Sequence, residues 1–162
     1  MNVTYSNRRS QTGSFMIEAL IGILIFFIGA LTMIGLQANG IAVQTDAQYR
    51  IEASNLADRI VGEITVGVDR TTTATIQNSL NAYAYNATRT ATCNYSGGAQ
   101  PTAPAAIGKW ISDVSSILPT SNGTMRQILV ETANANRVTV TICWQTASDS
   151  TPRRHTVISY IN

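Results

Sequence analysis

The residues with the most reactive side chains are two cysteines and one histidine, Cys93, Cys143 and His155. A thiolate beside an imidazole could act as a nucleophile, and thiolates together with imidazoles could bind zinc. A zinc site normally needs two ligands close together in the chain, and this sequence has no such pair. It also has no glycine-rich phosphate loop, no dinucleotide fingerprint and no paired carboxylates in an apolar setting. The sequence therefore predicts no enzyme, metal site or cofactor, and the Cys–His pair stays open as an alternative to a disulfide.

Glu18 is another candidate functional residue because of its sequence context. It precedes an apolar run of 18 residues, from Ala19 to Leu36, that has no charge and only Thr32 as a side-chain hydrogen-bonding group. A helix of that length is about 27 Å long, which is enough for one membrane crossing. No face of this helix is polar, which argues against a buried helix of a soluble protein. A carboxylate at its edge normally has a partner, and the alternative is a position among the lipid headgroups.

A short basic leader precedes the apolar run. Arg8 and Arg9 lie on its N-terminal side, and positive residues in that position tend to stay in the cytoplasm. We therefore expect the chain after Leu36 to cross into an oxidising compartment, where a disulfide between Cys93 and Cys143 is the simplest use of the thiols. Without the two leader arginines, the 11 basic residues fall to 9, equal to the 9 acidic residues. This balance argues against nucleic-acid binding.

The helical pattern continues beyond the apolar run as an amphipathic segment over 37–66. No proline interrupts it, and the first convincing stop is near Gly67. We expect one helix from Phe15 to Val66, apolar all round over 14–36 and amphipathic afterwards. The apolar face of its second half consists of residues at helical spacing, namely Ala42, Tyr49, Ala53, Leu56, Ile60 and Ile64.

The remaining residues, 67–162, must cover that apolar face. Between Asp69 and Thr102 we expect one or two short strands in a long loop, partly because Ala82–Tyr85 alternates. Pro104 then begins a short amphipathic helix that carries Trp110 into the core and ends before Pro119. Three strand-like runs follow, at Thr124–Thr132, Arg137–Gln145 and His155–Ile161.

The middle strand-like run alternates cleanly between apolar and polar residues. One face should pack on the long helix, and the other should lie outward or under a loop. We therefore expect an α+β fold in which a long N-terminal helix packs on a small antiparallel sheet. The first face contains Val138, Val140, Ile142 and Trp144, and the second contains Arg137, Thr139, Thr141 and Cys143.

The N-terminal features resemble those of type IV prepilins and the related pseudopilins. In that superfamily a leader ends in glycine, a glutamate is the fifth residue after it, and an apolar helix follows, as Gly13, Ser14 and Glu18 are arranged here. The resemblance implies that a prepilin peptidase cleaves between Gly13 and Ser14 and removes 1–13. It also implies N-methylation of Ser14, although the first mature residue in the family is most often Phe and here Phe15 is second. Glu18 would then be a carboxylate used in processing and assembly.

Further residues resemble the minor pilins of the PilV type, namely Gly35-Leu36-Gln37, Arg50, Ala53, Leu56-Ala57-Asp58-Arg59, Trp110, Leu118-Pro119 and the run Val138–Trp144. The resemblance implies the type IV pilin fold and the function of a minor pilin. Such a protein is a low-abundance structural subunit that primes or caps pilus assembly and influences adhesion or motility.

The partners implied by this resemblance are the major pilin and other minor pilins, through the N-terminal helix, and the prepilin peptidase. The chain would first span the bacterial inner membrane once, with its N-terminus in the cytoplasm and its globular domain in the periplasm, and then reach the pilus at the cell surface. No small-molecule substrate is implied. One alternative is a pseudopilin of type II secretion or competence. Another is a signal-anchored periplasmic membrane protein that keeps 1–13 and never enters a fibre.

Overall fold

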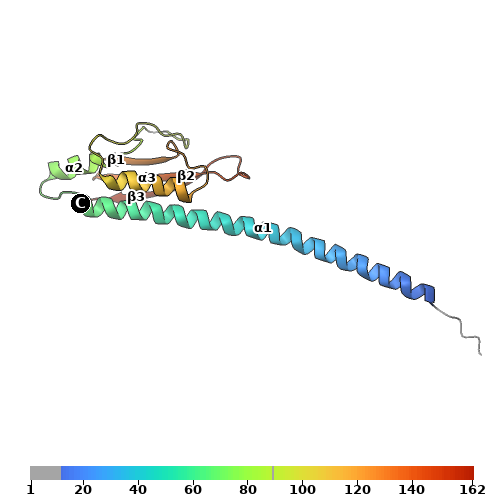
Figure 1. Ribbon diagram of the computed structural model, residues 1–162. Coiled ribbons are helices and arrows are strands. Elements are labelled where there is room, and N and C mark those ends of the chain that lie inside the picture. The colour runs from blue at the N-terminus through green and yellow to red at the C-terminus, as the bar shows by residue number, and fades with distance from the viewer. Residues whose placement is uncertain (1–11, 89) are drawn as a thin grey trace, which may run out of the picture. The chain divides into compact units, whose positions relative to one another are not determined.

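The computed structural model describes residues 12–88 and 90–162 (Figure 1). The chain divides into a part that ends at Thr45 and a compact domain, Asp46–Asn162, and each is described by itself. The elements of the described residues are helices α1 (Thr12–Gly67), α2 (Thr73–Ala82) and α3 (Ala105–Ile117) and strands β1 (Arg126–Glu131), β2 (Arg137–Trp144) and β3 (Arg153–Tyr160). These elements confirm the predicted α+β class.

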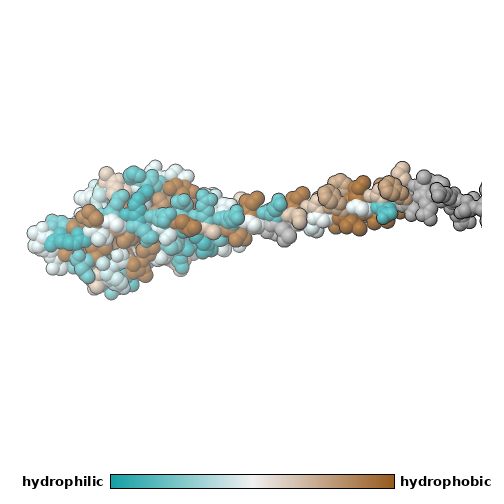
Figure 2. Space-filling view, turned by 90° about the horizontal axis from the view of Figure 1, so that it is seen from below, coloured by the Kyte–Doolittle hydropathy of each residue, from teal (hydrophilic) through white to brown (hydrophobic). Residues whose placement is uncertain are grey.

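The part of α1 that ends at Thr45 is an apolar helix with no packed face. The large apolar side chains described between Phe15 and Ile34 are all more than half exposed, from 51% for Ile21 to 74% for Phe15. Figure 2 shows apolar side chains gathered along this segment. The polar Thr32 side chain donates to the Gly29 carbonyl at 2.7 Å, so its hydrogen-bonding capacity is used within the helix. Among the described residues, α1 is the one helix long and apolar enough to cross a membrane.

From Asp46 onward, α1 contributes one buried face to the compact domain. This face lies at helical spacing and consists of Ala53, Leu56, Ala57, Ile60 and Ile64, which are all buried. Tyr49 is half-buried against the same core. Ala42, which we predicted as the first residue of this face, is exposed, because it precedes the domain that would have covered it.

The sheet is antiparallel with the strand order β1-β2-β3. The β1–β2 pairing runs from Arg126 opposite Ile142 to Glu131 opposite Arg137. The β2–β3 pairing is continuous over all eight residues of each strand. The three strand-like runs that we predicted are therefore confirmed as strands, with bounds that differ by at most two residues.

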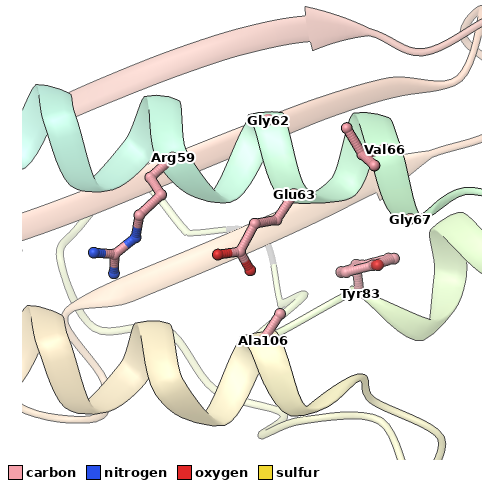
Figure 3. A pocket seen from close by; sticks show the side chains of 7 residues that line it. All are labelled: Arg59, Gly62, Glu63, Val66, Gly67, Tyr83 and Ala106. Atoms are coloured by element: carbon pink, nitrogen blue, oxygen red, sulfur yellow. The ribbon is translucent and has the colours of Figure 1, made fainter.

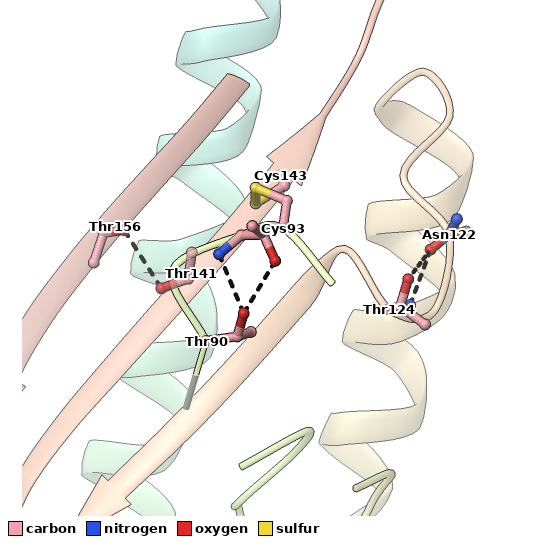
Figure 4. The surroundings of a disulfide bond; sticks show 8 residues. Thr90, Cys93, Asn122, Thr124, Thr141, Cys143 and Thr156 are labelled. Atoms are coloured by element: carbon pink, nitrogen blue, oxygen red, sulfur yellow. Dashed lines mark hydrogen bonds between the residues drawn. A yellow bond between two sulfur atoms is a disulfide. The ribbon is translucent and has the colours of Figure 1, made fainter. Parts of the chain in front are cut away.

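The two faces of β2 have different surroundings, as its alternation predicts. Val138, Val140, Ile142 and Trp144 are fully buried in one core with residues of α1 and α3. Trp110 of α3 joins this core and donates its indole N–H to the Leu56 carbonyl of α1 at 3.0 Å. Figure 4 views the sheet from its other face, with α1 and α3 behind it. The predicted helix after Pro104 is confirmed as α3.

The segment between Asp69 and Thr102 differs from the prediction of one or two short strands. It contains the helix α2, whose N-terminus is capped by reciprocal hydrogen bonds between Thr72 and Thr75. Tyr85 forms isolated bridges with Ala99 and Ile128 rather than a strand. The prediction of strands did not weigh the Thr72 and Thr75 side chains, which satisfy the first turn of the helix.

Candidate functional site

The residues predicted for processing lie at the start of α1. Gly13 and Ser14 fall in its first turn, but their side chains are outside the described part of the chain, as is the leader segment 1–11. Glu18 is exposed, and it is the sole ionisable residue of the sequence between Phe15 and Thr45. It has no hydrogen bond or ion pair with any described residue. This segment therefore presents one carboxylate on a surface that is otherwise uncharged.

Cys93 and Cys143 are joined by a disulfide with an S–S distance of 1.98 Å and a Cα–Cα distance of 6.0 Å. Cys143 is buried near the end of β2, on the face opposite to the helices, and packs with Tyr95 and Met125 (Figure 4). The bond ties the loop that contains Cys93 to the central strand of the sheet. The side chain of Gln127 holds the same loop through its carbonyls, donating to Asn86 at 2.8 Å and to Thr88 at 2.9 Å.

The disulfide excludes the alternative that we considered for the cysteines, a nucleophilic Cys–His pair. Both sulfur atoms are bonded, so the described residues contain no free thiol that could act as a nucleophile with His155. The His155 side chain comes from β3, and its Nε2 atom is buried without a hydrogen bond. Within residues 12–88 and 90–162 there is also no cluster of three or more His, Cys, Asp or Glu side chains that could hold a metal ion.

A surface groove of about 560 Å³ lies between the end of α1, α3 and Tyr83 (Figure 3). Glu63 extends from α1 toward α3, and the nearby Arg59 is held by Asp113. Burial raises the pKa of the Tyr83 phenol, and the negative charge of Glu63 raises it further. The groove therefore places a carboxylate, Glu63, near a phenol that stays protonated, Tyr83.

A charged cluster fixes the start of the domain half of α1. Arg153 of β3 forms ion pairs with Asp46 and with Asp149, the latter at 2.7 Å, and Asp46 also accepts from Arg50 at 3.1 Å. Hydrogen bonds from Arg153 and Thr146 lower the pKa of Asp149. No sequence pattern predicts the Asp46–Arg153 pair, because its members are far apart in the chain.

Arg126 is a buried charged residue that the sequence analysis did not predict. Its side chain is buried, and burial lowers the pKa of the guanidinium. The guanidinium donates to neutral oxygens only among the described residues: the carbonyls of Ile111, Ser121 and Asn122 and the hydroxyl of Ser115. These bonds connect β1 to α3 and to the 118–122 connection. A strand that begins with Arg usually exposes it, so the sequence gives no reason to expect a buried one.

The apolar start of α1 with its lone Glu18 is therefore the candidate site. Comparison with protein-family models, with curated proteins and with solved structures found no match to this chain.

Proposed function

We propose that this protein is a minor type IV pilin, a low-abundance subunit that enters a pilus through the apolar start of α1 and helps to prime or cap its assembly. The observation that carries the proposal is a single carboxylate, Glu18, on an exposed and otherwise uncharged helical segment from Phe15 to Thr45. A helix that is apolar all round needs lipid or other apolar helices around it. A pilin uses both surroundings in turn, first the inner membrane and then the core of the fibre.

Glu18 can set the axial register between neighbouring subunits after this transfer. When the helix moves from lipid into a bundle of apolar helices, an unpaired carboxylate in the bundle is costly. Cleavage between Gly13 and Ser14 would create an α-amino group close to the depth of Glu18. The ammonium of one subunit can then pair with the Glu18 carboxylate of its neighbour, which fixes their axial offset.

The domain half of the chain supports the same proposal. The Cys93–Cys143 disulfide suits a domain that folds on the oxidising side of the membrane. Its α+β architecture, with one face of a long helix packed on a small antiparallel sheet, agrees with the pilin fold that the sequence resembles.

The role of Glu18 can be tested with charge-changing variants in the parent organism. We expect Glu18→Gln to leave membrane insertion and leader cleavage intact but to reduce the amount of this protein in sheared pili relative to membranes, while Glu18→Asp should have a milder effect. Glu52→Gln is a matched control, because Glu52 forms no ion pair among the described residues and lies in the domain half of α1. Equal incorporation of Glu18→Gln and the parent would show that the carboxylate does not guide assembly.

The intact mass of the membrane-extracted protein separates the pilin from the signal-anchored alternative. We expect loss of 1–13, a chain that begins at Ser14, and one methyl group on its amino terminus if methylation occurs. A mass that includes the leader would support a membrane-anchored protein that never enters a fibre. Processed protein that is absent from sheared pili, even with Glu18 intact, would instead favour a pseudopilin of a secretion or competence system.

A further inference from the structure

The sequence contains two Asn-Gly pairs, Asn39-Gly40 and Asn122-Gly123. In such a pair the backbone nitrogen of glycine can attack the carbonyl carbon of the asparagine side chain. Glycine favours this reaction because it has no Cβ to obstruct the approach and because its backbone adopts many conformations. The local structure decides whether a given pair can react, and the two pairs here have opposite local structures.

Asn122 lies in an exposed turn between α3 and β1. Its side-chain oxygen Oδ1 accepts two hydrogen bonds from Thr124, one from the backbone N–H at 3.0 Å and one from the hydroxyl at 2.8 Å (Figure 4). These donors withdraw electron density from the side-chain carbonyl carbon. They are also in place to stabilise the negative charge that develops on Oδ1 when a nucleophile adds to that carbon.

The nucleophile and the leaving group of the same pair are free of competing bonds. Within residues 12–88 and 90–162, neither the Gly123 N–H nor the Asn122 side-chain nitrogen Nδ2 has a hydrogen-bond partner. The Gly123 carbonyl, in contrast, accepts from the Tyr85 hydroxyl at 3.2 Å and from the Asn86 side chain at 2.7 Å. These bonds hold the Gly123–Thr124 peptide, which directly follows the nucleophilic nitrogen.

Asn39-Gly40 provides an internal comparison. Both residues lie within α1, where backbone N–H groups are bonded to carbonyls one turn earlier. The Gly40 nitrogen is therefore engaged in the backbone hydrogen bonding of the helix, which disfavours its attack on a carbonyl carbon. The same dipeptide is protected in one place and available in the other.

We propose that Asn122 is a site of spontaneous deamidation in the folded protein. The Gly123 nitrogen forms a bond to Cγ of Asn122 and loses its proton to solvent, and the Cγ–Nδ2 bond breaks to release ammonia. Water then opens the resulting five-membered imide. Attack at Cγ yields an aspartate at position 122, and attack at the main-chain carbonyl yields isoaspartate, in which the chain runs through the former side chain. This inference is independent of the proposed pilin function.

The reaction would change the surroundings of Arg126. The Asn122 carbonyl now accepts from the Arg126 Nε at 3.3 Å and from the Met125 N–H at 3.0 Å. In the isoaspartate product this carbonyl becomes part of a free carboxylate, and in the aspartate product a carboxylate appears on the side chain next to it. Either product brings a negative charge to a buried guanidinium that is otherwise bonded to neutral oxygens.

The test follows the oxidised full-length protein in detergent during incubation in mildly alkaline buffer. Trypsin separates the two sites, because Asn122 lies in peptide 110–126 and Asn39 in the peptide that ends at Arg50. We expect the 110–126 peptide to gain about 1 Da, the difference between an amide and a carboxylic acid, while the other peptide stays unchanged. In urea-denatured protein both peptides should react, and Asn122 should react more slowly than in the folded protein.

Two variants test the roles of the neighbours. Gly123→Ala should slow the reaction several-fold, and it should fold normally because a Cβ at this position would meet only the Tyr85 hydroxyl, at 3.8 Å. Thr124→Val removes the hydroxyl donor to Oδ1 and should also slow the reaction several-fold. The proposal is overturned if folded Asn122 reacts no faster than in denatured protein, if Asn39 reacts as fast as Asn122 in the folded state, or if neither variant changes the rate.

Discussion

Asp149 is linked to α1 through Arg153, which pairs with both Asp149 and Asp46. It lies in the connection between β2 and β3, accepts the Thr146 N–H at 3.0 Å, and pairs with Arg153. Arg153 in turn reaches Asp46 on α1. Because these bonds favour the ionised carboxylate, the pKa of Asp149 is lower in the folded protein than in the unfolded chain.

This lowered pKa predicts a pH dependence of stability. A carboxylate with a depressed folded-state pKa contributes stability above its unfolded pKa, and the contribution is lost as the pH falls toward the folded-state value. We therefore expect the urea midpoint of the parent to fall between about pH 5 and about pH 3. Asp149→Asn should lower the midpoint at neutral pH and reduce this pH dependence. Asp58→Asn, which removes a carboxylate without an ion pair among the described residues, should leave the pH dependence unchanged.

Residue-scale prediction succeeded where the chain itself supplies the reason. The Cys93–Cys143 pair could be expected because the apolar span places both thiols in an oxidising compartment with no other evident use. Arg126 could not, because its acceptors are carbonyls and a hydroxyl that only the folded chain brings together. Backbone acceptors are present at every residue, so a sequence gives no indication of which of them will surround a buried cation.

At the scale of elements, the C-terminal end of α1 is tightly constrained by its neighbours. The helix ends at Gly67, and a Cβ placed on Gly67 would lie 2.1 Å from the Tyr83 hydroxyl. Arg70 then donates to the carbonyls of Val68 and Asn162, at 3.1 Å and 3.0 Å, and also bonds to Thr65. An arginine at this point satisfies carbonyls that the end of a helix leaves open.

Two alanine variants of α1 should therefore have opposite effects. Gly67→Ala forces Tyr83 to move and should destabilise the domain by about 1–3 kcal/mol. Gly62→Ala meets no atom within 4 Å and should stabilise it by about 0.5–1 kcal/mol, because alanine favours a helix interior. Adding Tyr83→Phe removes the clashing hydroxyl and should recover much of the loss in Gly67→Ala. Chemical denaturation of the four proteins measures this, and equal effects at positions 62 and 67 would contradict the proposed contact.

The elements that could be predicted are those with a sustained period. The helix α3 repeats apolar residues at helical spacing, and β2 alternates over its whole length, so each pattern allows one interpretation. The helix α2 is short, and its apolar side depends on Ile76 and Leu80, which are too few for a period to emerge from threonines and asparagines. The Thr72 and Thr75 capping box was the available signal, and it predicts a helix only when capping is weighed above strand propensity.

At the scale of the whole molecule, the disulfide is the strongest covalent constraint on the domain. It closes a loop with a sequence separation of 50, for which a chain-entropy argument gives about 4 kcal/mol of stabilisation. We expect Cys93→Ala/Cys143→Ala to lose stability on this order, as measured by thermal or urea unfolding. The free energy of unfolding of the reduced parent should match that of the double variant, and a reduced parent as stable as the oxidised one would contradict this expectation.

The bond state can be checked directly. Alkylation of denatured, unreduced protein should modify neither Cys93 nor Cys143, because both sulfur atoms are already bonded. After reduction both should be modified. Stoichiometric alkylation of both cysteines before reduction would mean that the isolated protein carries free thiols.

The loop that Cys93 anchors covers part of the outer face of the sheet, where Gln127 and Thr141 are buried. Protein that is synthesised and kept in a reducing cytosol lacks the bond that holds this loop in place. We therefore expect antibodies raised against such material to include some directed at strand surfaces that the oxidised protein hides, and to miss epitopes that depend on the closed loop. An immunogen intended to detect the native molecule should be produced in a compartment where the disulfide can form.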